Sequence, residues 1–176
     1  MRRNGFTMLE VMIALLVFSL GLLGMAGLLA VSVQTNHSAY LRTQATFLAQ
    51  SMADRMRANN LGLWNNGSAT ASAYDGTYDS STAGSTSTTC LGSNTCTWSN
   101  VVARDQKIFS NQLVSFLPNP SATIACKPTG TVPSGNALIE RPPYTGQCTI
   151  AINWNEKSSE PGQHDNTAGL TWVFQP

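Results

Sequence analysis

The sequence predicts an α+β protein in which one long N-terminal helix packs on a small antiparallel sheet of three to four strands. Three observations favour this class. An apolar run lies near the start of the chain, an amphipathic stretch follows it directly, and short alternating runs occupy the C-terminal third. The 176 residues suffice for one modest domain plus an extended element. We therefore expect one globular part attached to one long helix.

The first element is an apolar run that is long enough to cross a membrane. Residues 11–33 are 23 consecutive residues without a charge. As a helix they span about 35 Å, which exceeds the roughly 30 Å of a hydrocarbon core. Arg2 and Arg3 precede the run, so the positive-inside rule places the N-terminus in the cytoplasm and the rest of the chain outside it.

An amphipathic stretch at residues 34–60 continues the helix. Its apolar side chains recur at spacings of four, three, four and four, which draws one stripe along the helix. The stripe consists of Leu41, Ala45, Leu48, Met52 and Met56. Asn59, Asn60 and Gly62 supply the signal that ends the helix. We expect the stripe to form the surface on which the sheet packs.

Residues 62–99 form the next segment, and their composition predicts a long loop, which we expect Cys90 and Cys96 to tie down. They are rich in Ser, Thr, Gly, Ala and Asn, and their only charges are Asp75 and Asp79. The ligand spacing of a calcium loop is missing between these two acids. We therefore expect no metal and no cofactor here.

That second helix is predicted over residues 105–117, and Pro118 ends it. Three runs that alternate between apolar and polar residues follow, as half-buried strands do. These runs are residues 122–126, 148–154 and 170–174.

Four cysteines, all on the expected exported side, indicate two disulfides, because an even number in an oxidising compartment is typical of structural pairs. They are Cys90, Cys96, Cys126 and Cys148. If the first two strands pair antiparallel, Cys126 and Cys148 can face each other. This geometry favours Cys126–Cys148 with Cys90–Cys96, and the two other connectivities stay open at this point.

The first ten residues carry most of the functional information. The segment Gly5-Phe6-Thr7-Met8-Leu9-Glu10 places a small residue before the apolar run and a carboxylate at its start. An acid at the start of a membrane-spanning helix usually marks function. Two alternatives exist: Thr7 and Glu10 fit a capping box, and Ala30-Val31-Ser32 has the small-x-small pattern of a conventional secretory cleavage site.

This junction, followed by the apolar run, resembles the class III signal of type IV pilins and type II secretion pseudopilins. The resemblance implies that a prepilin peptidase cuts between Gly5 and Phe6 and that Phe6 becomes N-methylated. It also implies that Glu10 pairs with the N-terminal amine of a neighbouring subunit. The expected parts are a leader at 1–5, a transmembrane helix at 6–33, its amphipathic continuation at 34–60 and a head at 61–176.

Three glycines in the apolar run, Gly21, Gly24 and Gly27, have two interpretations. Small residues are ordinary where membrane helices pack closely. Glycine also weakens a helix by about 1 kcal/mol relative to alanine, so the segment could unwind inside a filament. Both interpretations remain open.

The remainder of the chain is similar to PilV-type minor pilins, through residues 49–59, the helix before Pro118 and the three strands. The resemblance implies a role in initiating pilus assembly, with the prepilin peptidase, other minor and major pilins and the inner-membrane assembly machinery as partners. It places the anchored protein in the inner membrane with its head in the periplasm, and later in the surface pilus. A pseudopilin of a type II secretion system is the alternative.

Other functional classes fit less well. The two histidines, His37 and His164, stand in no recognisable catalytic motif, so we expect no enzyme. A DNA-uptake pilin would present a basic patch, whereas the cations after residue 57 are scattered. No nucleic-acid partner is expected.

Overall fold

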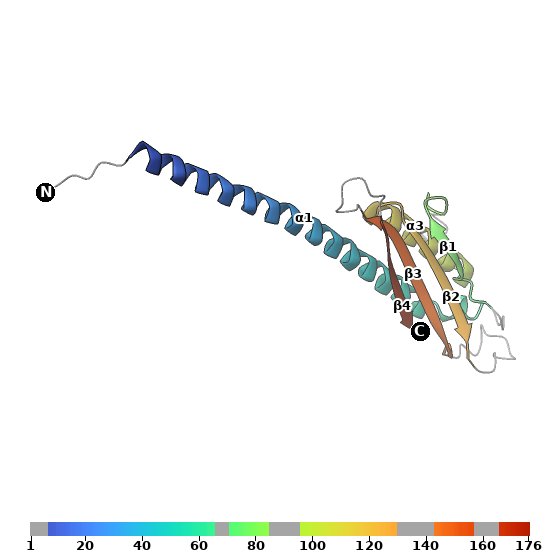
Figure 1. Ribbon diagram of the computed structural model, residues 1–176. Coiled ribbons are helices and arrows are strands. Elements are labelled where there is room, and N and C mark those ends of the chain that lie inside the picture. Colours follow the sequence, from blue (N-terminus) through green and yellow to red (C-terminus); the bar gives the residue numbers. More distant parts are fainter. Residues whose placement is uncertain (1–6, 66–70, 85–95, 130–142, 157–165) are drawn as a thin grey trace. The chain divides into compact units, whose positions relative to one another are not determined.

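The computed structural model describes residues 7–65, 71–84, 96–129, 143–156 and 166–176. The chain divides into two compact units, Met1–Ala39 and Tyr40–Pro176, which are described separately. The helix α1, Met8–Ala58, contributes to both units. Figure 1 shows its course and the elements that follow it.

The N-terminal unit consists of the first part of α1. Among the described residues, α1 is the one helix long and apolar enough to cross a membrane, with a mean hydropathy of 2.4 over its most apolar 18 residues. The large apolar side chains from Met8 to Val33 are all exposed. The helix continues without interruption through Gly21, Gly24 and Gly27. A surface this apolar is suited to lipid or to other apolar helices, and it fits anchoring in the inner membrane.

The C-terminal unit contains a four-stranded sheet in the order β1-β2-β3-β4, with every neighbouring pair antiparallel. The strands are β1, Gly76–Asp79; β2, Ser121–Pro128; β3, Gly146–Glu156; and β4, Asn166–Phe174. The strands therefore lie in the sheet in the order in which they occur in the chain (Figure 1). The predicted α+β class with three to four strands is confirmed.

The core lies between one face of this sheet and two helices, the C-terminal part of α1 and α3, Trp98–Phe116. All five residues of the predicted stripe on α1 are buried, which confirms the amphipathic prediction. Strands β2 and β3 bury alternate residues, as expected for a sheet with one covered face. The buried residues from the sheet include Ile124, Ile150, Ile152 and Trp154, and those from α3 include Phe109 and Leu113.

The prediction that residues 62–99 form a long loop is partly wrong. The end of a short helix, α2, Asn60–Leu63, and the whole of β1 lie within it. β1 was missed because only one of its four residues is buried, so it shows no apolar alternation. Pairing with β2 holds the strand in place, from Gly76 opposite Ile124 to Asp79 opposite Ser121. Tertiary pairing thus overrides weak local propensity.

Several boundaries also differ from the predicted ones. α1 ends at Ala58, two residues before the predicted end. α3 begins at Trp98, seven residues before the predicted start, because Thr97 caps it by accepting a hydrogen bond from the Asn100 N–H at 3.3 Å. The three C-terminal strands contain the predicted runs and extend beyond them.

The predicted disulfide between Cys126 and Cys148 is confirmed, and the two residues are direct cross-strand partners on β2 and β3. Both lie in the core. Cys96 is also disulfide-bonded. Cys90 lies outside the described residues, so the pairing Cys90–Cys96 stays a prediction.

Candidate assembly site

The first turn of α1 carries the acid that the sequence singles out. Glu10 borders a shallow apolar hollow on the helix surface, together with Val11, Ala14, Leu15 and Phe18. Its carboxylate has no hydrogen-bond or ion-pair partner within the part of the chain that the structure describes. An unpaired carboxylate beside apolar side chains is costly in a membrane unless a cation reaches it. The arrangement is therefore suited to bind a positive group from another molecule.

Of the two reciprocal bonds of a capping box between the described residues Thr7 and Glu10, only the one accepted by Thr7 is observed. The Glu10 N–H donates to Thr7 Oγ1 at 3.4 Å and to the Thr7 carbonyl at 3.1 Å, so Thr7 caps the helix. In a full capping box the Glu side chain would also accept the N–H of the capping residue. No such bond exists among the described residues, and the carboxylate is not used by the cap.

The three glycines of α1 have open surroundings in the single chain. A Cβ added at Gly21, Gly24 or Gly27 would meet no atom within 4 Å. The backbone at these positions is therefore accessible to a neighbouring helix. Both interpretations of these glycines stay predictions. Gly5 and Phe6, the proposed cleavage junction, lie outside the described residues.

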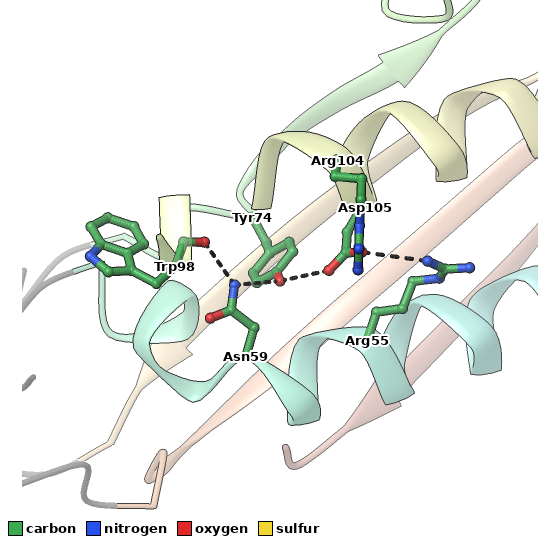
Figure 2. Close-up of polar contacts among 6 residues, drawn as sticks. All are labelled: Arg55, Asn59, Tyr74, Trp98, Arg104 and Asp105. Carbon is green, nitrogen blue, oxygen red and sulfur yellow. Dashed lines mark hydrogen bonds and ion pairs between the residues drawn. The ribbon is translucent and has the colours of Figure 1, made fainter. Parts of the chain in front are cut away.

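A second group of polar residues surrounds a buried carboxylate in the C-terminal unit, where α1, α3 and the segment before β1 meet (Figure 2). At its centre Asp105 of α3 is 2% exposed. Arg55 Nη1 donates to Asp105 Oδ1 at 3.4 Å, and Arg104 Nη2 lies 3.6 Å from the same oxygen. The Tyr74 hydroxyl donates to Asp105 Oδ2 at 3.2 Å. We call these four residues, with Asn59, the Asp105 cluster.

The Asp105 cluster ties three segments together. Asn59 Nδ2 donates to the Tyr74 hydroxyl at 3.0 Å and to the Trp98 carbonyl at 3.0 Å (Figure 2). Burial raises the pKa of Tyr74 far above its usual range, and the hydrogen bond from Asn59 opposes this shift. The phenol therefore stays protonated and keeps donating to Asp105. The network fixes the start of α3 against the end of α1.

Sequence analysis did not single out Asp105, although one signal was present. Asp105 stands four residues before Phe109 and eight before Leu113, so it lies on the buried stripe of α3. A charge at an apolar position predicts a buried partner, because an isolated buried charge is unstable. The partners Arg55 and Tyr74 are distant in sequence, and only the fold identifies them.

The acids of the predicted loop are occupied by backbone groups. Asp75 accepts the N–H of Ser72 at 3.0 Å and the N–H of Cys126 at 2.8 Å, and burial raises its pKa. Asp79 accepts hydrogen bonds from the Ser81 hydroxyl and the N–H groups of Ser81 and Thr82, which lower its pKa. Within the described ranges no group of three or more His, Cys, Asp or Glu residues is placed to hold a metal ion.

The comparisons with known proteins agree with the N-terminal signal. Residues 1–26 match the family model described as the prokaryotic N-terminal methylation motif. No curated protein and no solved structure matches the chain.

The motif and the fold together define a class. A long apolar N-terminal helix packed through its second part on a four-stranded antiparallel sheet, with a cross-strand disulfide, matches the type IV pilin fold. The methylation motif supports a type IV pilin-like protein. The signal implies processing by a prepilin peptidase and association with pilins and a membrane assembly machinery.

Proposed function

We propose that this chain is a minor pilin of a type IV pilus and takes part in initiating pilus assembly. The observation that carries the proposal is the methylation motif at residues 1–26. The motif leads into an exposed apolar helix whose Glu10 carboxylate has no partner among the described residues. The apolar helix and the Glu10 carboxylate can both serve assembly with other subunits. The apolar helix packs with other helices, and the carboxylate sets their register.

The proposed mechanism begins with cleavage after Gly5, which removes the basic leader at residues 1–5. The new amine of Phe6 is then methylated and keeps its positive charge. In the membrane, the Glu10 carboxylate of one subunit pairs with the Phe6 amine of its neighbour. Two charges that are each costly in lipid favour the one register in which they meet.

The proposed topology follows the same signal. Residues 6–33 anchor the processed protein in the inner membrane, residues 34–60 continue the helix, and residues 61–176 form a periplasmic head. Assembly transfers the subunit from the membrane into the surface pilus. Its partners are other minor and major pilins and the inner-membrane assembly machinery.

A pilus is favoured over a type II secretion filament by the large head with its disulfides and by the resemblance of residues 49–59 to PilV-type minor pilins. The direct test deletes the gene in the source organism and counts surface pili, beside a complemented strain. We expect a sharp loss of pili that complementation restores. Normal piliation with a defect in protein secretion would instead identify a pseudopilin, and normal behaviour in both would refute a role in filament assembly.

A further inference from the structure

We propose that Arg55 and Arg104 form an anion-binding pair that takes a carboxylate side chain from a neighbouring subunit. The identity of the neighbour rests on the proposed function, because it requires assembly into a filament. The binding chemistry does not, because it follows from the charges and hydrogen bonds of the Asp105 cluster alone (Figure 2).

The cluster carries more positive than negative charge. Two guanidinium groups share one carboxylate, and both approach the same oxygen, Asp105 Oδ1, at 3.4 and 3.6 Å. Asp54, the next acid along α1, lies 3.0 Å from Arg57 instead. Within the described residues no other carboxylate lies within 4.0 Å of Arg55 or Arg104. Among the described residues, one positive charge of the cluster is therefore uncompensated.

Most hydrogen-bond donors of the two arginines are unused. A guanidinium carries five N–H donors. In the described part of the chain Arg55 makes one side-chain hydrogen bond, at 3.4 Å, and Arg104 makes none, since its closest contact to Asp105 is an ion pair at 3.6 Å. The Arg104 Nε is moreover buried without a partner. The pair thus retains donors for a second acceptor.

The two arginine side chains reach solvent, although the Arg104 Nε itself is buried. The side chains of Arg55 and Arg104 are 29% and 37% exposed, whereas the side chain of Asp105, their shared partner, is 3% exposed. Asp105 is itself fixed by Tyr74, which is bound to Asn59. Two arginines from different helices are therefore held at one point, which lowers the entropy cost of binding an anion.

The surroundings favour a protein carboxylate over a nucleic acid. Guanidinium groups match the planar, two-oxygen geometry of a carboxylate. Arg55 also borders a hollow on α1 with Phe47, whose 60% exposed ring offers an apolar contact to a protein surface. Nucleic-acid binding would need a longer stripe of cations than this pair supplies.

The binding chemistry is tested on the purified full-length chain in detergent, with glutarate as the probe and chloride at matched ionic strength as the reference. We expect glutarate to raise the Tm by about 1–2 °C through binding to the folded state. Arg104→Gln should abolish this increment, Arg104→Lys should reduce it, and Arg42→Gln, which removes an exposed arginine elsewhere on α1, should keep it. No increment in the unchanged protein, or an equal one in Arg104→Gln, would overturn the proposal.

The filament neighbour is tested in cells with Arg104→Glu, and Arg42→Glu as the matched charge reversal. We expect Arg104→Glu to lower the amount of the protein in sheared pili about fivefold or more, at an unchanged level in the membrane. Equal incorporation of both variants would refute the subunit contact. If the unchanged protein is itself missing from sheared filaments, the proposed function fails, while the glutarate result still decides whether the anion site exists.

Discussion

The guanidinium of Arg57, near the end of α1, lies 5.3 Å from the centre of the Phe174 ring at the end of β4. The same side chain donates to the Gln175 carbonyl at 3.4 Å and to Asp54 Oδ1 at 3.0 Å. One residue therefore ties the C-terminal end of the sheet to the helix beneath it. Because β4 is an edge strand with one hydrogen-bonded neighbour, this tie matters more than it would in a central strand.

Replacing Arg57 by alanine should lower the free energy of unfolding by about 1 kcal/mol, since a partly exposed cation–π contact and a long hydrogen bond are both lost. Denaturant unfolding of the full-length chain in detergent measures the change. Arg57→Lys should retain part of the stability through its charge. Arg42→Ala, at an exposed position on the same helix, should have no effect, and an equal loss in that variant would contradict the assignment.

The tyrosines predict a loss of stability in alkali. Burial raises the pKa of Tyr78 to about 12, and it also raises the pKa of Tyr74 and of Tyr144. Above pH 10 the unfolded chain loses these phenolic protons while the folded chain keeps them, so the folded state binds more protons and its stability falls as the pH rises. Each tyrosine contributes at most about 1.4 kcal/mol per pH unit.

We expect the tyrosinate absorbance of Tyr74, Tyr78 and Tyr144 to appear together with unfolding as the pH rises from 10 towards 12, rather than before it. Tyr78→Phe should show a shallower fall of stability over this range, because one of the linked protons is removed. Full ionisation of the tyrosines in a chain that stays folded would contradict the prediction.

Gly62 should not tolerate a side chain. A Cβ at this position would lie 2.7 Å from Val102 Cγ2, 2.9 Å from Asn59 Nδ2 and 2.9 Å from Tyr74 Cε2. Because Asn59 and Tyr74 are held by the Asp105 cluster, they cannot move at low cost. Gly62→Ala should therefore destabilise the folded state by about 1–3 kcal/mol.

Gly21→Ala is the matched control for Gly62→Ala. It adds the same methyl group where no atom lies within 4 Å, and it should leave the unfolding of the globular part unchanged. Thermal unfolding of the two variants side by side distinguishes a crowded glycine from an open one. Similar stability of both proteins would show that the site around Gly62 relaxes.

The processing prediction concerns the junction between Gly5 and Phe6. The intact mass of the protein isolated from its own cells should correspond to loss of the five leader residues and gain of one methyl group on Phe6. Gly5→Leu should prevent this cleavage and leave the full-length mass. A cut near Ser32 would instead identify a conventional secreted protein and refute the prepilin interpretation.

The two interpretations of Glu10 predict different outcomes for one substitution. Glu10→Ala should leave cleavage intact but reduce the protein in sheared pili about fivefold or more, because the subunit amine loses its anionic partner. Glu10→Gln keeps the size of the side chain and one acceptor oxygen but removes the negative charge, so it should fail equally. Normal assembly of Glu10→Gln would show that charge pairing is not required.

The sequence was most informative where the type and spacing of neighbouring residues indicate which side chains are buried. The apolar run and the stripe from Leu41 to Met56 were correctly interpreted because helix periodicity is local. The cross-strand partners Cys126 and Cys148 followed from two alternating runs that favour an antiparallel pair. β1 was missed because its stability comes from β2 and from Asp75, which accepts the Cys126 N–H across 51 positions of sequence.

The two candidate sites differ in the same way in how far the sequence predicts them. Glu10 and its junction are recognisable in the sequence, since a carboxylate at the start of an apolar run conflicts with its surroundings. The Asp105 cluster is different, because Arg55, Tyr74 and Arg104 are ordinary residues in their own segments. Local periodicity and charge thus determined the anchor, the amphipathic helix and the class of the fold. Only the tertiary structure decided which distant residues share a buried charge, because burial removes water and forces polar groups to find partners wherever the chain brings them together.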